Sequence, residues 1–240
     1  MTEKRKDELA ANLRAVEERI AAACAAAGRP REDVTLVVVT KTYPASDVRL
    51  LAELGVRHVA ENRDQEAADK AAETADLDLT WHFVGQLQTN KARSVAAYAD
   101  VVQSVDRLRL VDALSAAAVR EGRTLGCLLQ VALDAGEEHA RGRGGVAPEE
   151  VGELADAVAN ADGLRLDGLM TVAPLAGHYA GRQRAAFGRL MEISARLRAT
   201  HPAANMVSAG MSSDLEEAVA AGATHVRVGT AVLGVRPKLR

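Results

Sequence analysis

Short apolar runs alternate with helix-like segments along almost the whole chain, and this alternation constrains the fold more than any other feature. Eight runs have the length and composition of buried strands, and they cover residues 34–40, 56–60, 81–84, 100–105, 124–133, 164–170, 205–208 and 224–229. Strands that alternate with helices form parallel sheets, because each helix carries the chain back to the start of the next strand. The pattern therefore predicts an α/β fold.

Strand number and chain length favour a closed (β/α)8 barrel over an open sheet. The chain has 240 residues, which suits a barrel of this kind. An open doubly wound sheet usually has a glycine-rich turn after its first strand, but here that strand leads into Lys41-Thr42-Tyr43-Pro44. We predict a single-domain TIM barrel over residues 1–240, preceded by an amphipathic helix. The apolar stripe of that helix consists of Leu9, Leu13, Val16, Ile20 and Cys24.

Composition argues against several classes of partner. The net charge is −3 and aromatic residues make up 2%, so neither phosphate-backbone attraction nor base stacking is expected. No apolar leader or membrane-length run is present, which predicts a cytoplasmic protein without membrane contact. The six histidines lack HxH or HExxH spacing, and Cys24 and Cys127 are interpreted as small buried hydrophobes, so we predict no metal site.

Polar residues gather where the predicted strands end, which is the edge that carries active sites on a barrel. Lys41 is the most informative, because it directly follows the apolar run LVVVT. It is either a solvated strand end or a reactive amine at the barrel mouth. Lys41 shares its parity with Val37 and Val39, so its amine points inward if those two side chains do.

The predicted seventh and eighth strands end in segments that suit an anion. Gly210 in SAGMSSDLEEA allows close backbone approach, while Ser208 and Ser212 offer hydroxyls, and a helix beginning at Ser212 would add free N–H groups. Gly229-Thr230 supplies a second bare backbone and hydroxyl. The alternative is an ordinary helix cap and a turn glycine. The occurrence of both features at neighbouring strand ends favours a phosphate-type site.

Three further residues have open interpretations. Arg227 lies between two valines, and its guanidinium either points inward to an acceptor or outward to a helix carboxylate. His82 in WHFVG is either a satisfied core histidine or part of the chemistry. Met170 either packs in the core or lines a ring pocket. We also expect residues 134–145, DAGEEHARGRGG, to form a loop that acts as a mobile flap.

A lysine and an anion site on one barrel face suggest a Schiff base with a phosphorylated aldehyde, and pyridoxal phosphate is the commonest such cofactor. At this level the chain resembles the YggS/PROSC family of pyridoxal phosphate-binding proteins with an alanine racemase-like fold of type III. The motifs that carry the resemblance are VVVTKTYP, AENRDQEA, WHFVGQLQTNKAR, QSVD, LDGLMTVAP and SAGMSSDLEEAVAAGATHVRVGTAVLG.

The resemblance implies a role for each candidate residue. Lys41 would carry the cofactor as a Schiff base, and Arg227 would face the pyridine nitrogen. Asn62, His82 and Met170 would lie near the ring. The phosphate would be surrounded by Ser208, Gly210, Met211, Ser212, Gly229 and Thr230. Two positions depart from the usual motifs, because Ala60 replaces a glycine before Glu61-Asn62 and Ala209 replaces a methionine.

The resemblance also implies a function. An arginine only donates hydrogen bonds, so a ring nitrogen that accepts from Arg227 stays unprotonated and stabilises carbanions poorly. Racemases of this fold add a tyrosine base from a second domain, whereas the barrel motifs here reach almost to Arg240. We expect a monomeric carrier or buffer of pyridoxal 5′-phosphate in vitamin B6 homeostasis, with apo-enzymes as partners. The alternatives are a low-activity amino-acid racemase and a nonenzymatic regulator that uses the cofactor as a signal.

Overall fold

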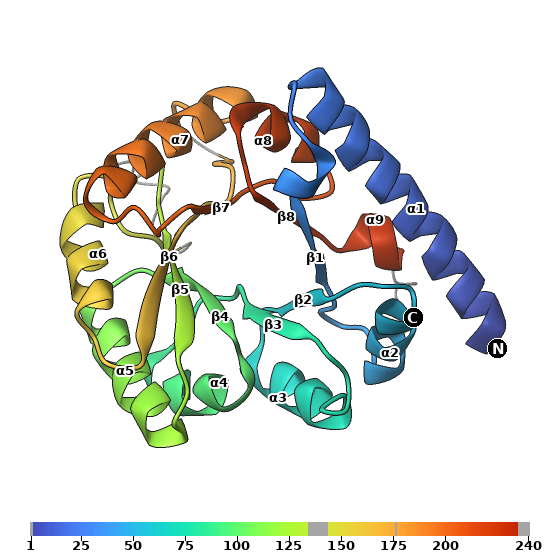
Figure 1. Ribbon diagram of the computed structural model, residues 1–240, viewed down its shortest axis with the longest axis horizontal. Helices are drawn as coiled ribbons and strands as arrows, with labels where there is room; N and C mark the ends of the chain where they lie inside the picture. Colours follow the sequence, from blue (N-terminus) through green and yellow to red (C-terminus); the bar gives the residue numbers. More distant parts are fainter. Residues whose placement is uncertain (1, 134–143, 176, 235–240) are drawn as a thin grey trace.

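The computed structural model describes residues 2–133, 144–175 and 177–234. Within them, eight parallel strands form a closed barrel in which β1 pairs with both β2 and β8. Figure 1 views this barrel nearly end-on, with the helices arranged outside the ring of strands. The predicted (β/α)8 barrel and its preceding helix are confirmed. Most of the predicted flap, residues 134–143, lies outside the described residues.

The strands are shorter than the apolar runs, because each run includes residues that lead into or out of the ladder. The strands are β1 (Thr35–Val39), β2 (His58–Glu61), β3 (Thr80–Phe83), β4 (Val101–Val105), β5 (Leu125–Gln130), β6 (Leu164–Met170), β7 (Met206–Ser208) and β8 (His225–Val228). The helices are α1 (Thr2–Ala26), α2 (Ala45–Glu53), α3 (Asp64–Glu73), α4 (Ala92–Tyr98), α5 (Leu108–Glu121), α6 (Val151–Ala159), α7 (Gln183–Thr200), α8 (Leu215–Ala221) and α9 (Thr230–Leu233).

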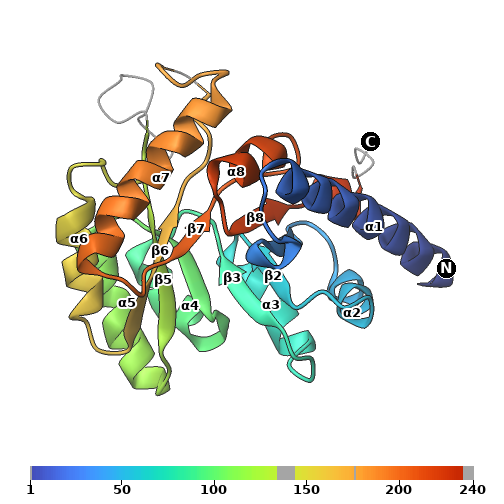
Figure 2. The same cartoon turned by 45° about the horizontal axis from the view of Figure 1, so that its top comes forward.

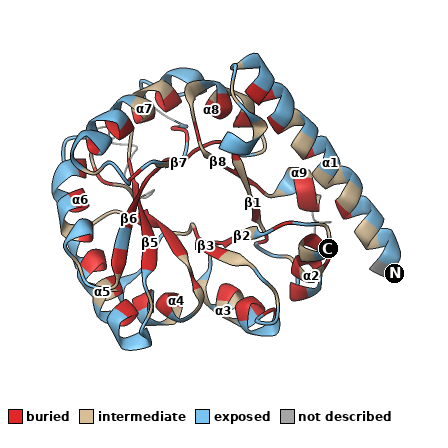
Figure 3. Ribbon diagram, in the orientation of Figure 1, coloured by how far each residue is buried: buried red, intermediate tan, exposed pale blue. Residues whose placement is uncertain are grey.

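Apolar packing occurs mainly between the strands and the surrounding helices. Two large buried clusters fill this layer, one around β4 to β7 and the other around α1, α2 and β1. Figure 3 shows the strands largely buried and the outer faces of the helices exposed. A third, much smaller cluster joins Val101, Leu128 and Met170, with Met206 packed against it. The side of the strands that faces away from the helices is therefore less apolar than the helix-facing side.

The long α1 helix packs across the outside of the barrel, next to α8 and α9 (Figures 1 and 2). Its buried residues Leu9, Val16 and Ile20 belong to the second large cluster. Arg19 also forms an ion pair with Glu216, with 2.7 Å between Nε and Oε1. The helix thus braces the part of the barrel that holds the first and last strands.

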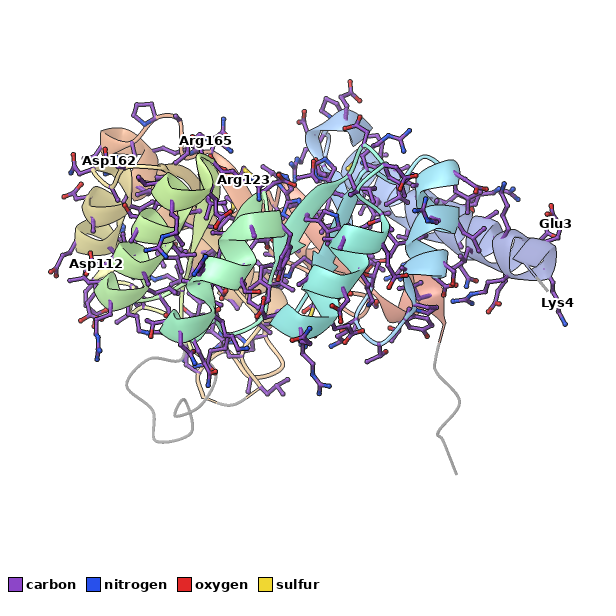
Figure 4. All side chains as sticks on the ribbon, turned by 90° about the horizontal axis from the view of Figure 1, so that it is seen from below. Glu3, Lys4, Asp112, Arg123, Asp162 and Arg165 are labelled. Carbon is purple, nitrogen blue, oxygen red and sulfur yellow. The ribbon has the colours of Figure 1, made fainter. Side chains whose placement is uncertain are left out.

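The two edges of the barrel carry different sets of residues. Arg123 and Asp162 precede β5 and β6, and Figure 4 places them with Arg165 at the edge where the strands begin. The candidate site residues lie toward the opposite edge, where the strands end.

Both cysteines are buried and free, as predicted. No helix of the described chain is long and apolar enough to span a membrane.

Candidate functional site

Lys41 lies in the turn that follows β1, and its side chain is exposed. On β1, Val37 is in register with Arg227, and Val39 is in register with Ala60, which is itself beside His82. Neighbouring residues of a sheet share a face, so Val37 and Val39 line the interior together with Arg227 and His82. Continued two residues past the end of β1, the same alternation predicts that Lys41 faces the inner side of the mouth. No described residue forms a hydrogen bond or ion pair with its amine.

Arg227 points into the barrel, so the inward interpretation is correct. It is 4% exposed, and its guanidinium donates to Ser208 Oγ at 2.6 Å and to the carbonyl oxygen of Thr171 at 2.8 Å. Burial lowers the pKa of Arg227 to about 10, which leaves it charged at neutral pH. No carboxylate of the described chain forms an ion pair with this cation. Its remaining N–H groups are available to an acceptor.

A directional chain of hydrogen bonds begins at Arg227 and crosses the barrel interior. Ser208 Oγ donates to Gln103 Oε1 at 2.6 Å, and Gln103 Nε2 lies 2.9 Å from His82 Nδ1. His82 Nε2 in turn lies 3.0 Å from His58 Nδ1. Because an amide nitrogen only donates, His82 accepts at Nδ1 and carries its proton at Nε2, from which it donates to His58. The chain fixes the tautomers of both histidines.

Three histidines lie together at the end of this chain. Their ring centroids are 5.3 Å apart for His58 and His82, and 6.4 Å apart for His82 and His225. Burial, aided by neighbouring histidines and Arg227, lowers the pKa of His82 well below 6.5 and that of His225 to about 4. Burial also lowers the pKa of His58. The folded protein therefore holds all three neutral near pH 7.

These histidines predict a loss of stability on mild acidification. The unfolded chain takes up a proton at His225 near pH 6.5, whereas the folded chain does so only near pH 4, so stability falls as the pH drops between those values. His225→Gln should reduce the slope of unfolding free energy against pH by up to ~1.4 kcal/mol per pH unit in that window. Denaturant titrations across the window measure the slope, and equal slopes for both proteins would contradict the assignment.

The loops after β7 and β8 meet at the mouth. Thr230 Oγ1 donates to Ser212 Oγ at 3.3 Å, and the nitrogen of Met211 donates to Asp214 Oδ1 at 2.6 Å. Gly210 has φ +90°, and a Cβ there would lie 2.6 Å from Ala218 Cβ, so only glycine fits this turn. The helix begins at Leu215 and not at Ser212 or Ser213; Asp214, the other helix-start residue that the sequence suggests, occupies the cap position and accepts from the Met211 N–H in the preceding turn.

The remaining predicted residues are divided between the mouth and the interior. Met170 is buried at the end of β6 beside Ser208, in the small inner cluster. Asn62 follows β2, and its Oδ1 is buried without a hydrogen-bond partner among the described residues. Asn62 also lines a cavity of 470 Å³ with Gln86, Lys91 and Arg107. Gly229 lies directly over β1, since a Cβ there would be 3.2 Å from the carbonyl oxygen of Val39.

The predicted site residues lie at two depths, some inside the barrel and others at its mouth. Ser208, His82 and Arg227 belong to the interior hydrogen-bond chain, whereas Ser212 and Thr230 meet above it at the mouth. The sequence places Gln103 among the polar residues at the end of the fourth strand, but its link between Ser208 and His82 was not predicted, and neither His58 nor His225 was predicted at the site. These residues share one signal: each is a polar side chain in an apolar strand, at a position that faces the barrel interior. His225, for example, is two residues from Arg227 on the same strand, so both side chains point to the same face. In the described ranges, no group of three or more histidine, cysteine or acidic side chains is arranged to hold a metal.

Comparison with known proteins identifies relatives of this sequence and this fold. Residues 11–237 match the family model described as alanine racemase, N-terminal domain. The pyridoxal phosphate homeostasis protein of Mycobacterium tuberculosis H37Rv is 43% identical, over 97% of this chain and 94% of that protein. A protein of unknown function from Bifidobacterium adolescentis has a TM-score of 0.85 at 33% identity, covering 95% of this chain and 96% of that one.

A further solved structure is PipY of Synechococcus elongatus with pyridoxal phosphate (PLP) bound. Its TM-score is 0.77 at 36% identity, covering 91% of this chain and 100% of that one. The closed (β/α)8 barrel and the match to the alanine racemase N-terminal domain together define an alanine racemase-like barrel. The chain belongs to the YggS/PROSC family, whose curated relatives carry the name pyridoxal phosphate homeostasis protein.

Proposed function

We propose that this protein binds pyridoxal 5′-phosphate through Lys41 and carries or buffers the cofactor for apo-enzymes in vitamin B6 homeostasis. One observation carries the proposal. An exposed lysine amine without a described partner follows β1, and the buried guanidinium of Arg227 reaches the carbonyl of Thr171 just past the end of β6, at the same edge of the barrel. No carboxylate of the described chain forms an ion pair with that guanidinium. The names of the relatives and the cofactor in the Synechococcus structure support the same cofactor here.

The residues present fit this cofactor. Pyridoxal phosphate supplies an aldehyde that condenses with an amine to a C=N bond and water, a ring nitrogen that accepts hydrogen bonds, and a phosphate. Lys41 provides the amine, and Arg227 is a buried donor for a ring acceptor. Asn62 has a buried oxygen without a described partner, which a polar group of a ligand would satisfy. The hydroxyls of Ser212 and Thr230 converge as a phosphate would require.

Each residue has a separate role in this proposal. Arg227, held by Ser208 and Thr171, keeps a donor aimed at the ring nitrogen, and that nitrogen remains unprotonated because arginine cannot accept. Met170 and neutral His82 line the ring. The phosphate would be held by the backbone and hydroxyls of Ser208, Gly210, Met211, Ser212, Gly229 and Thr230.

The tyrosines of the chain argue against racemisation as the main function. The hydroxyl of Tyr43 donates to the carbonyl oxygen of Gly234 at 2.7 Å. Burial raises the pKa of Tyr98, so its hydroxyl stays protonated and cannot take up a further proton. The ring of Tyr179 packs edge-on against His178 in the segment between β6 and α7. Neither Tyr43 nor Tyr98 is therefore free to act as a second proton-transfer base, and the ring contact of Tyr179 is with its own neighbour in the chain. We therefore favour a carrier over a racemase. We also propose that this carrier is monomeric and cytoplasmic.

Cofactor transfer and turnover distinguish the two functions. The loaded protein, mixed with an apo-enzyme that depends on pyridoxal phosphate, should restore that enzyme's activity faster than spontaneous release of cofactor allows. The loaded protein alone should leave the optical rotation of free L-amino acids unchanged. Sustained racemisation that disappears in Lys41→Ala would replace the carrier function with an enzymatic one.

A further inference from the structure

The peptide groups on both sides of Lys41 are held by charged side chains of α3. Lys70 Nζ donates to the carbonyl oxygen of Thr40 at 2.8 Å. On the other side, the backbone N–H of Thr42 donates to Glu66 Oε1 at 2.5 Å. These two bonds fix the planes of the peptides that precede and follow the Lys41 Cα atom. The direction of the Lys41 side chain depends on those planes, because they determine its φ and ψ angles.

Lys70 is the centre of this arrangement. Its ammonium group also donates to Glu61 Oε1 at 2.5 Å and to Glu66 Oε1 at 2.8 Å. Together with Thr40, these acceptors use all three of its N–H groups. Lys70 is 5% exposed and Glu61 is fully buried. Lys70 is therefore a fixed cation, in contrast to the exposed and unpartnered amine of Lys41.

The turn needs external support. Thr42 has φ +69°, a left-handed conformation that is unfavourable for a β-branched residue. Such backbone strain persists only where surrounding contacts determine the conformation. The hydrogen bond from Thr42 to Glu66 and that from Tyr43 N to the Thr40 carbonyl, at 3.1 Å, are the contacts that hold this turn.

A purely structural role does not account for this cluster. Burying ions costs desolvation energy, and a buried pair is often replaceable by apolar residues without loss of stability. Apolar residues would join α3 to the barrel equally well, but they could not bind the Thr40 carbonyl and the Thr42 N–H. The carboxylates respond to their different surroundings. Burial raises the pKa of Glu61, whereas hydrogen bonds from Lys70 and Thr42 outweigh burial and lower that of Glu66.

We propose that Lys70 and Glu66 are positioning residues for Lys41, holding its two flanking peptides so that the amine meets an incoming aldehyde from the barrel mouth. This inference rests on the proposed function, since it assigns the role of Lys41 to cofactor binding. Neither residue touches the cofactor itself. Each acts through the backbone of the turn.

The test compares Glu66→Ala, Glu66→Gln and Lys70→Met with the wild type. Glu66→Ala and Lys70→Met should slow formation of the borohydride-trapped pyridoxyl adduct on Lys41 at least about tenfold. Glu66→Gln keeps an acceptor for the Thr42 N–H and should stay within about threefold of wild type. Lys6→Met is the matched control. It breaks an exposed lysine–glutamate pair between α1 and α2, in which Lys6 Nζ lies 2.6 Å from Glu53 Oε2. This control should react at the wild-type rate.

A second measurement needs no cofactor. Amide hydrogen exchange at Thr42 in the unloaded protein should be at least about tenfold faster in Glu66→Ala than in wild type or Glu66→Gln. If Glu66→Ala formed the adduct at the wild-type rate and exchanged its Thr42 amide at the wild-type rate, the inference would be overturned, whether or not Lys70→Met folds. A wild-type protein that forms no adduct on Lys41 would instead overturn the proposed function, while the exchange result still tests the turn.

Discussion

Lys41→Ala should abolish covalent retention of pyridoxal phosphate while leaving the unfolding free energy within about 0.5 kcal/mol of wild type. The side chain is exposed and makes no contact on which the barrel depends, so its removal takes away the amine without opening a cavity. After borohydride reduction, the intact mass of the variant should lack the pyridoxyl increment that wild type gains. Lys41→Arg, which keeps the charge but cannot condense with an aldehyde, should behave in the same way.

The competing lysine in this region provides the sharpest contradiction. Lys70 lies on the other side of the turn with its three N–H groups engaged. A fully retained adduct in Lys41→Ala, mapped to Lys70, would show that the ion cluster opens and that Lys70, not Lys41, carries the cofactor. An unfolded Lys41→Ala variant would show instead that Lys41 supports the fold.

Gly85→Ala should destabilise the protein by about 1–3 kcal/mol and weaken cofactor binding at least about tenfold. A Cβ at Gly85 would lie 2.1 Å from the carbonyl oxygen of Asn62 and 2.8 Å from its Cα atom. These are backbone atoms, so Asn62 itself must move, and it carries a buried oxygen at the proposed site. Denaturant unfolding and equilibrium titration with pyridoxal phosphate measure the two effects.

The control for this overpacking is another glycine-to-alanine change. Gly188 lies in α7, and a Cβ there would meet nothing within 4 Å. Gly188→Ala should be neutral or stabilising by up to about 1 kcal/mol, because alanine favours the helix. If Gly85→Ala matched this control in both stability and affinity, Asn62 would not be held by Gly85 and its proposed role would lack support.

Local patterning was sufficient to predict the barrel and to place Lys41 just after its first strand. Apolar runs alternate with helices because each strand is covered by a helix, and strand parity follows from backbone geometry alone. For Arg227, which lies between two valines, the sequence left both faces of the strand open, and in the structure the side chain is buried inside the barrel. The predicted ends of strands were less accurate. Glu61, for example, was expected to follow its strand but is the last residue of β2.

Contacts between distant segments could not be predicted in this way. The bond between Ser208 and Gln103 joins residues 105 positions apart, and that between Lys70 and Thr40 joins residues 30 apart. No local pattern specifies which polar groups meet across a barrel. The start of the helix near Leu215 shows a related ambiguity, because serine and aspartate are both good caps: the sequence suggested Ser212 or Ser213 and also Asp214, and the structure has Asp214 at the cap.

The measurement that tests the central claim most directly is the identity of the modified residue in the wild-type protein. The purified protein is loaded with pyridoxal phosphate, reduced with borohydride, digested and mapped by mass spectrometry. Our account predicts one pyridoxyl group per chain, on the peptide that contains LVVVTKTYP and at Lys41. Absence of the group from Lys41, with or without modification elsewhere, would contradict it.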